Sequence, residues 1–479
     1  MATRNWPPRA IAAIGAVWAL SALLATAPAP VQAQTPAPGA RIIALDAQAW
    51  SGSSVNVLAG VRQTLFTDGA HQYAAYYAAD GGLTLAKRRL GDTRWETRQT
   101  GHKGNVSDAH NHIALVVDGA GYLHLSWDHH NNPLRYARAK APGSLELEAP
   151  RAMLGDQEQS VTYPQFHRLP GGDLVFLYRA GGSGNGQLVM NRYATQTGAW
   201  RRVQDRLIDG EGRRSAYWDM TVDPAGRMHL AWNWRETPDV ASNHDLAYAS
   251  SLDGGVSWTG LDGQALRLPL TESSASYALR IPQHSKLMNP PVVAVDAAGR
   301  PYISSYWSPA PGAKPRFHVV VGEQQAWRVI AGPEAASDFS LSGVDTKFPP
   351  LSRAALLVEQ HGKRRSLNLI YRNHEQQIML STASIAATAS ANTSERIGSA
   401  TSVDHPAWTH RPLTQDSVGA WEPSYDPVQW ARLGQAHMLV QTVQQQDGND
   451  RGAARAASPL GVLVWRSAPA RVSPARSRR

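Results

Sequence analysis

The chain of 479 residues contains no cysteine, so no disulfide can hold its fold together. Stability must therefore come from a large hydrophobic core, and a chain of this length buries enough apolar surface for one large or two ordinary domains. The same absence removes a favoured ligand of structural zinc.

Long apolar runs are also scarce. One covers residues 11–27, after Arg4 and Arg9 and before the small-residue stretch 31–33. This order is typical of a secretory signal peptide, which we place at residues 1–33. No second run is long enough to span a bilayer, so we expect a secreted or periplasmic protein with no membrane span.

Acidic residues are outnumbered, because 47 Lys and Arg stand against 38 Asp and Glu and leave a formal net charge of +9. Part of the excess lies in residues 469–479, a basic tail that we expect to be disordered. Nucleic acid is a poor candidate for the partner, since no nucleic-acid-binding motif is present. An acidic polysaccharide fits both the charge and the compartment. We expect the protein to act on it as a monomer.

What the chain does contain is a repeated phrase, an Asp/Gly turn followed by an alternating strand that ends in aromatic or polar residues. Regular units of this kind, each with several short strands, are typical of a β-propeller. We therefore predict an all-β, seven-bladed β-propeller over residues 46–468, after a Pro/Ala-rich leader at 34–45. The seven predicted strands cover residues 72–77, 123–127, 174–178, 228–232, 302–307, 367–371 and 434–440.

The segment 251–258, S-L-D-G-G-V-S-W, resembles an Asp-box, the hairpin found in sialidase-type propellers. Its Asp and Gly suit a tight turn, and its Trp packs between strands. The segment therefore marks the fold and carries no chemistry.

Five histidines fall within 21 residues, between His110 and His130. The intervening sequence reads as two short strands around a turn at 117–121, and such a hairpin brings its open ends together. We therefore expect His110 and His130 to face one cleft, whereas the other three fit ordinary strand or surface positions. Imidazoles in a shared cleft suit proton transfer or metal binding, because histidine changes charge near neutral pH.

A second hairpin of the same build joins Tyr163 to Arg179 in the next repeat. We expect these two residues to converge as the histidines do, one blade further round. The predicted cleft then holds two histidines, a tyrosine and an arginine at one mouth of the central channel.

Four motifs in this region stand in order: D-A-H-N at 108–111, D-H-H-x-x-P-L-R-Y at 128–136, T-Y-P-x-F at 162–166 and Y-R-x-G-x-S-G-N-G at 178–186. Together they resemble the BNR-4-repeat polysaccharide lyases. These are seven-bladed propellers that include ulvan lyases and enzymes cleaving the rhamnosyl-α-1,4-glucuronate bond. The resemblance runs from about residue 100 to 310 and points to the superfamily, not to one substrate.

The resemblance implies a secreted carbon–oxygen lyase that cleaves a 4-linked uronic acid bond by β-elimination. In this chemistry the C5 proton is removed and the 4-linked sugar is expelled. His110 is the implied base, and Tyr163 suits protonation of the departing oxygen. Arg179 suits pairing with the carboxylate as charge develops on it, because a guanidinium grips two oxygens at once. His130 would assist as a carboxylate binder or as an alternative base.

Other residues are expected to contact the substrate or a metal. Trp234 suits stacking on a sugar ring, and Arg235 suits a second acidic group. Asn111 and His244 are further candidate substrate contacts. The mechanism requires no cofactor, but the family often holds a structural zinc or calcium, for which His244 and His284 are the candidate ligands.

Two other functions stay open. A sialidase-like glycoside hydrolase would explain the propeller and the segment 279–282, L-R-I-P, but the chain has no evident Tyr/Glu nucleophile pair. A non-catalytic carbohydrate-binding propeller would use the aromatic residues and Arg179. It has no use for His110, His130 and Tyr163 together.

Overall fold

The computed structural model describes Met1 and residues 34–467, apart from residues 59–63, 363, 387–394, 398–400 and 449–455. The predicted signal peptide and the predicted basic tail lie outside this part of the chain. Among the described helices, none is long and apolar enough to cross a membrane.

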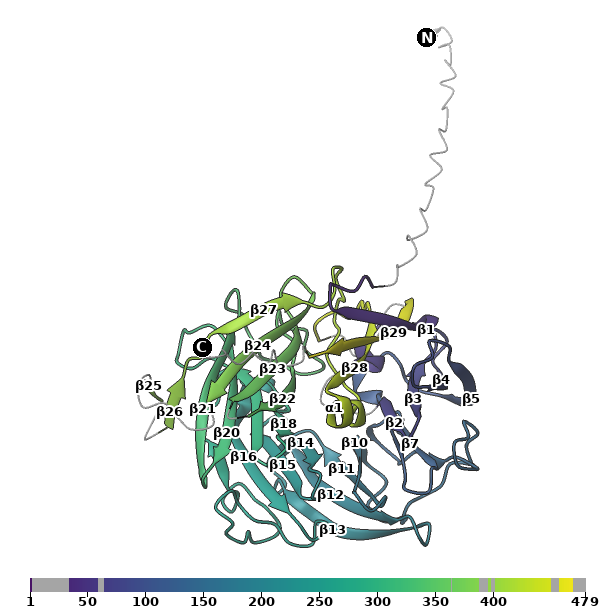
Figure 1. The fold of residues 1–479 in the computed structure, drawn as a ribbon, viewed down its shortest axis with the longest axis horizontal. Helices are drawn as coiled ribbons and strands as arrows, with labels where there is room; N and C mark the ends of the chain where they lie inside the picture. Colours follow the sequence, from purple (N-terminus) through teal and green to yellow (C-terminus); the bar gives the residue numbers. More distant parts are fainter. Residues whose placement is uncertain are drawn as a thin grey trace, which may run out of the picture. The chain divides into compact units, whose positions relative to one another are not determined.

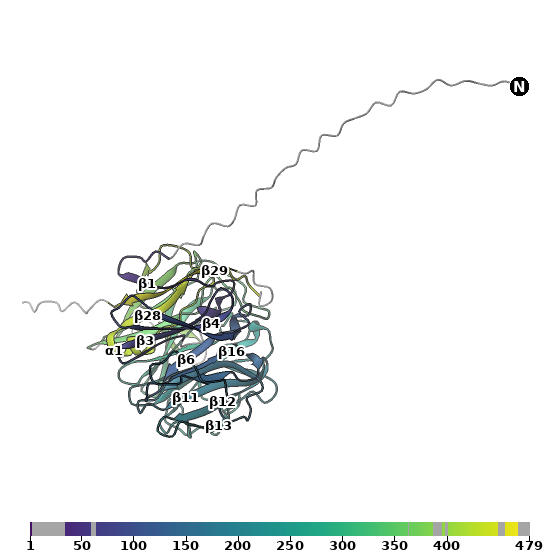
Figure 2. The ribbon, with the colours of Figure 1, turned by 90° about the vertical axis from the view of Figure 1, so that its right-hand side faces the viewer.

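Seven sheets follow one another around a central axis, which confirms the predicted seven-bladed β-propeller (Figure 1). Figure 2 shows the ring from the side, with β11, β12 and β13 running next to one another. Blade 1 consists of β2 (Leu65–Asp68), β3 (His71–Tyr77), β4 (Gly82–Arg89) and β5 (Glu96–Lys103), and blade 2 of β6 (Ile113–Val117), β7 (Leu123–Trp127) and β9 (Tyr136–Arg138). Blade 3 consists of β8 (His130–Asn132), β10 (Val161–Arg168), β11 (Leu174–Gly182), β12 (Asn185–Ala194) and β13 (Ala199–Asp209). Blade 4 consists of β14 (Ser215–Val222), β15 (Met228–Arg235), β16 (Asn243–Ser251) and β17 (Tyr277–Leu279).

The remaining blades carry the additions to this plan. Blade 5 consists of β18 (Val292–Val295), β19 (Pro301–Trp307), β20 (Arg316–Glu323) and β21 (Ala326–Glu334), extended by β26 (Thr401–Asp404) and β25 (Glu395–Ile397). Blade 6 consists of β22 (Ala355–His361), β23 (Arg364–Arg372), β24 (Ile378–Ala386) and β27 (Trp408–Pro412). Blade 7 consists of β28 (Gln435–Gln441), β29 (Ala457–Arg466) and β1 (Ala40–Trp50). Four short helices lie between the strands: η1 (Ser54–Asn56), η2 (Ala109–Asn111), η3 (Val240–Ser242) and α1 (Pro427–Leu433).

The strands β2, β6, β10, β14, β18 and β22 are innermost, since each contacts the next around the axis. In blade 7, helix α1 lies at this inner position, in contact with β2 and β28. The repeated phrase of the sequence is therefore the second strand of a blade. It forms β3, β7, β11, β15, β19, β23 and β28.

The aspartate of the repeated segment explains why this segment folds as a turn followed by a strand. In blade 2, Asp118 Oδ1 accepts hydrogen bonds from the backbone N–H groups of Ala120 and Tyr122, both at 2.9 Å. Its other oxygen lies 3.1 Å from Nε2 of His124 on the following strand. Asp223 and Asp296 repeat the same pattern of turn bonds in blades 4 and 5. Each carboxylate thus shapes a turn by satisfying backbone donors that the turn leaves unpaired.

The ring is closed by the N-terminal strand, because β1 pairs with β29 along its whole length, from Ala40 opposite Trp465 to Trp50 opposite Ala457. The predicted boundary between leader and propeller, at residue 46, therefore lies inside β1 and is wrong. Local composition could not locate it, since the partner strand comes from the other end of the chain.

The turn at 251–258 is held by its own hydrogen bonds. The Asp253 carboxylate accepts from the backbone N–H groups of Val256 and Ser257, each at 3.0 Å. Trp258 is 1% exposed and donates from Nε1 to the Gly255 carbonyl. None of these side chains lines the cavity described next, so their role is structural.

Candidate active site

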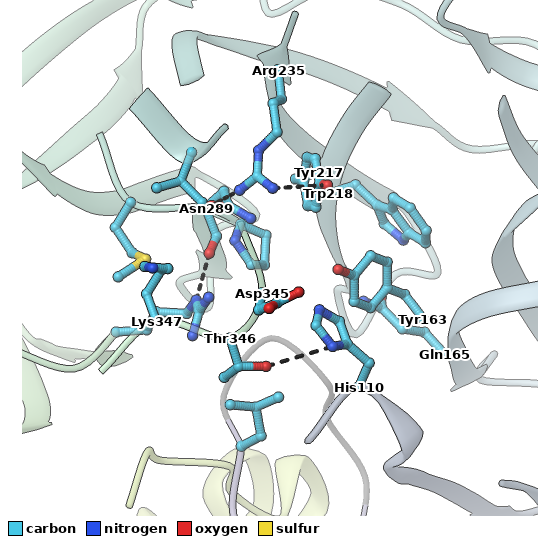
Figure 3. A pocket seen from close by; sticks show the side chains of 15 residues that line it. His110, Tyr163, Gln165, Tyr217, Trp218, Arg235, Asn289, Asp345, Thr346 and Lys347 are labelled. Carbon is cyan, nitrogen blue, oxygen red and sulfur yellow. Dashed lines mark hydrogen bonds between the residues drawn. The ribbon is translucent and has the colours of Figure 1, made fainter. Parts of the chain in front are cut away.

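A cavity with about 640 Å³ of empty space, counted to its solvent opening, lies at the mouth where the innermost strands begin. It is lined from six of the seven blades, by residues that precede or start those strands. In blade order these include Leu58, His110, Tyr163, Tyr217, Asn289 and Arg353. Side chains distant in the sequence therefore meet here (Figure 3).

His110 and His130 are held on one carboxylate. Asp108 caps helix η2, and its Oδ1 accepts from the backbone N–H of His110 at 2.9 Å and lies 2.7 Å from His110 Nδ1. Its Oδ2 is hydrogen-bonded to His130 Nδ1. The two imidazole rings stack with their centroids 4.1 Å apart. The prediction that the hairpin brings these histidines together is confirmed, whereas the role of Asp108 was missed.

The charge of Asp108 decides which nitrogens take part in chemistry. Burial by itself would raise its pKa, but the hydrogen bonds from His110 and His130 outweigh burial and hold the pKa well below its usual range. Asp108 is therefore an ionised acceptor. A neutral His110 that donates from Nδ1 to this carboxylate carries its basic lone pair on Nε2.

The neighbouring histidines have no such partner. Burial, with the nearby His129 and His110, lowers the pKa of His112 to about 3, and burial lowers the pKa of His129 to about 3 as well. Both rings are uncharged and buried. His112 directly precedes β6, close to the ordinary strand position that the sequence predicts, whereas the predicted surface position of His129 is wrong because this residue is buried.

Tyr163 enters the cavity from a bulge in β10, between Thr162 and Gln165. Its φ of +57° is a strained value for a side-chain-bearing residue, and such strain is concentrated at functional sites. The phenol points into the cavity next to His110, with ring centroids 5.9 Å apart (Figure 3). Arg179 Cζ lies 5.0 Å over the Tyr163 ring, so the predicted convergence of these two residues is confirmed.

Arg179 is 2% exposed, lies behind Tyr163 and does not itself line the cavity, contrary to its predicted place in the cleft. Its Nε donates to the Gly181 carbonyl at 3.1 Å, and its Nη1 is buried without a hydrogen-bond partner. A Cβ at Gly186 would lie 2.6 Å from Arg179 Cδ, so the glycine of this motif makes room for the guanidinium. No described carboxylate forms an ion pair with Arg179.

Arg235 forms the opposite wall of the cavity. It donates from Nε to Asn243 Oδ1 at 2.9 Å, from Nη1 to the Tyr217 hydroxyl at 3.0 Å, and from Nη2 to Asn289 Oδ1. These oxygens belong to neutral side chains, and no described carboxylate pairs with Arg235. A buried charge is costly unless it is compensated. Two buried guanidiniums without acidic partners therefore make this a site for an anion.

Tyr217 is the functional residue that the sequence reasoning overlooked. Burial would raise its pKa, but the charges of Arg235 and Arg179, with a hydrogen bond from Ser183, lower the pKa to about 8. The phenol can therefore exchange a proton near neutral pH. Its position offered a signal, because Tyr217 starts β14 much as Tyr163 starts β10 in the blade before.

Three expected substrate contacts, Trp234, Asn111 and His244, do not reach the cavity. Trp234 has no exposed surface and packs edge-on against Trp232 in the core, so it cannot stack on a sugar. Successive residues of a strand face opposite sides, and Arg235 takes the side of the cavity. Asn111 is 3% exposed, and its amide donates to the Asn105 carbonyl. It supports helix η2 and does not line the cavity.

The predicted metal ligands do not come together either. His244 lies outside the cavity, with Nε2 2.9 Å from Glu236 and Nδ1 3.1 Å from Asp245. Burial would lower its pKa, but these two carboxylates raise it. His284 is exposed. Among the described residues, neither belongs to a group of three possible metal ligands.

One such group does occur in the described part of the chain, formed by Asp108, His110 and His130, whose ligand atoms lie within 4.8 Å of one another. Imidazole and carboxylate suit zinc, so this donor set fits a metal better than His244 and His284 do. The same three residues, however, already form the hydrogen-bonded unit at the cavity.

Comparisons with known proteins agree on family and fold. A model of the BNR repeat-containing family matches residues 71–334, more than half of the chain. A relative described as "Ulvan lyase, short isoform", from Alteromonas sp. (strain LOR), is 26% identical over 136 residues. That alignment covers 25% of this chain and 25% of the relative, so the match spans about a quarter of the relative's length.

Solved structures of polysaccharide lyases share the propeller. A PL25 ulvan lyase superposes with a TM-score of 0.58 at 12% identity, over 81% of this chain and 89% of that one. The polysaccharide lyase Uly1 superposes with a TM-score of 0.61 at 14% identity, over 90% of this chain and 99% of that one. At these identities the likeness shows the fold alone.

Proposed function

Because this chain belongs to the BNR repeat-containing family, we propose that it is a polysaccharide lyase that cleaves a 4-linked uronic acid bond by β-elimination. The observation that carries the proposal is the pair of buried arginines without acidic partners, Arg179 and Arg235, beside an imidazole and two phenols. This arrangement provides a place for one carboxylate and proton-transfer groups within reach of it.

Proton removal is assigned to His110. The ionised Asp108 holds Nδ1 of this imidazole, so the neutral ring accepts the C5 proton at Nε2. Loss of that proton places negative charge on the carboxyl group of the uronic acid, as an enediolate. Arg235 meets this charge from the cavity wall, and Arg179 adds a second fixed positive charge from behind Tyr163. His130 binds the same carboxylate of Asp108, and its ring stacks on that of His110.

Proton delivery is assigned to Tyr163. Its hydroxyl lies in the cavity and has no hydrogen-bond partner among the described residues, so it can reach the 4-linked oxygen as that bond breaks. Tyr217 stands on the other side of the cavity with a lowered pKa and is the candidate for returning the site to its starting protonation state.

The proposed linkage is rhamnosyl-α-1,4-glucuronate, in a secreted enzyme that acts as a monomer. The name of the ulvan lyase relative supports this linkage. A PL25 ulvan lyase structure described as bound to -[GlcA(1-4)Rha3S]- shares the fold at 13% identity with a TM-score of 0.58, and it supports a substrate that contains both glucuronate and rhamnose. The positive net charge of the sequence also favours an acidic polymer.

A glycoside hydrolase explains the cavity less well. Retaining and inverting hydrolases most often need two carboxyl groups that flank the scissile bond. Of the described residues that line the cavity, Asp345 alone carries a carboxylate. A binding module without activity would leave the fixed tautomer of His110 and the lowered pKa of Tyr217 without a use.

Ultraviolet absorbance tests the proposal, because β-elimination creates a conjugated double bond and hydrolysis does not. We expect absorbance to rise with ulvan or gum arabic and to stay flat with the same polymers after carboxyl reduction. New reducing ends without absorbance would indicate a hydrolase. Binding without either signal would indicate a lectin.

A further inference from the structure

The link between β21 and β22 runs across the mouth of the channel. We call its residues 339–348 the crossing loop. It lines the cavity with Asp345, Thr346 and Lys347, although it starts from blade 5. The Thr346 hydroxyl lies 3.5 Å from His110 Nδ1 in blade 2, so the loop touches the proposed base (Figure 3).

Two sets of hydrogen bonds hold the crossing loop in place. On the side of blade 4, Val240 donates its backbone N–H to the Gly343 carbonyl at 2.9 Å, and Gly343 donates to Asp239 Oδ1 at 2.7 Å. The loop is therefore tied down before it reaches the cavity.

The second set lies on the side of blade 7. Gly448 donates its backbone N–H to the Thr346 carbonyl at 3.0 Å, and Phe348 donates to Asp447 Oδ1 at 2.6 Å. Asp447 also pairs with Lys347 Nζ at 3.1 Å. A loop tied at both ends by hydrogen bonds, and at one end also by an ion pair, forms a wall and not a hanging flap.

From these contacts we infer that the crossing loop turns the cleft into a pit, so that the enzyme removes units from chain ends and does not cut within a long chain. The inference rests on the proposed lyase function. A polysaccharide whose internal unit occupies the site must extend out of the site on both sides of that unit. The described lining surrounds the cavity from blade 1 to blade 6, and blade 7 is reached through the tethers of the loop.

The charge at the mouth of the cavity agrees with this inference. Asp345, which is exposed and has a φ of +64°, points its carboxylate into the mouth opposite Arg235 (Figure 3). A carboxylate there repels the next acidic unit of a continuing chain, while the arginines hold the first.

The test follows two quantities in one reaction: double bonds by absorbance and chain mass by light scattering. With ulvan or gum arabic, we expect double bonds to accumulate as products of one small size while the chain mass stays high. A rapid fall in chain mass with the first double bonds would overturn the inference and leave the lyase function intact. No absorbance with polymers or with short oligosaccharides would overturn the lyase function itself.

Two variants test whether the crossing loop causes cleavage from chain ends. Asp447→Ala removes the side-chain contacts of the second set of tethers, and a variant lacking residues 344–346 removes the wall. We expect both to shift the product pattern toward internal cleavage. Asp416→Ala, which loses an exposed contact to Thr35 away from the cavity, is the matched control and should keep the wild-type pattern. Unchanged end-wise products in both loop variants would refute the assignment.

Discussion

Asp108→Asn is the sharpest test of the proposed base. Asp108 binds His110 and His130 with its two oxygens, and its side chain is 10% exposed. An asparagine of the same shape offers one oxygen and one NH₂ group. One imidazole can then keep its Nδ1–H donor, whereas the other faces a donor and must move its proton to Nε2. If the proton moves on His110, this ring has no basic lone pair at Nε2. If it moves on His130 instead, the hydrogen bond between His130 and residue 108 runs in the opposite direction.

The size of the effect follows from the two charge-assisted bonds, which a neutral asparagine cannot form. A hydrogen bond to a charged group contributes about 1.5–3 kcal/mol, so two such bonds amount to about 3–6 kcal/mol. Since each 1.4 kcal/mol or so is a factor of about ten in rate, kcat should fall by about 10²–10⁴. This matches the usual contribution of a general base. KM should change little, because Asp108 does not line the cavity.

The assay is steady-state kinetics by absorbance, together with thermal unfolding. Asp223→Asn is the matched control, since Asp223 also pairs with a buried histidine, His229, but away from the cavity. The control should lower Tm and leave kcat unchanged. If Asp108→Asn keeps more than about a tenth of the wild-type kcat, or raises KM alone, the Asp–His pair is structural and another group removes the proton.

Further changes test the remaining roles. Tyr163→Phe should lower kcat by about 10²–10⁴ without unfolding, and a variant with near-normal turnover would remove Tyr163 from proton delivery. The rate of the wild type should change near pH 8, where Tyr217 loses its proton, and a Tyr217→Phe variant that keeps this step in its pH profile would contradict that assignment. Arg179→Lys should lower kcat by about 10²–10³, because a single ammonium replaces the planar guanidinium, whereas a rise in KM alone would make Arg179 a substrate clamp. Dialysis against EDTA should leave both kcat and Tm unchanged, and a loss of activity that zinc restores would place a metal in the mechanism.

The pH dependence of stability has a definite sign at Asp108. Its pKa is held below the usual range in the folded state, so its bonds stabilise the fold above an unfolded-state pKa of about 4. That contribution is lost as the pH falls toward the lowered pKa. Asp108→Asn should therefore weaken the dependence of Tm on pH in acid, as measured by thermal unfolding over a series of buffers.

Much of this protein is determined by short stretches of its sequence. The repeated Asp/Gly turn and its alternating strand predict seven blades, because the turn is closed by hydrogen bonds within five residues, as at Asp118. His110 with His130, and Tyr163 with Arg179, can be paired in advance for a similar reason. Each pair stands near the open ends of one hairpin, and a hairpin is a local structure.

The remaining features depend on contacts between distant parts of the chain, and only the tertiary structure decided them. Strand β1 belongs to the propeller because its partner β29 lies at the other end of the sequence. Arg235 faces the cavity, and Trp234 the core, because blade packing selects one side of β15. The anion site arises where Tyr217 and Asn289, from different blades, give Arg235 neutral partners. Closing the ring costs chain entropy that local sequence does not reveal, and packing between blades repays it.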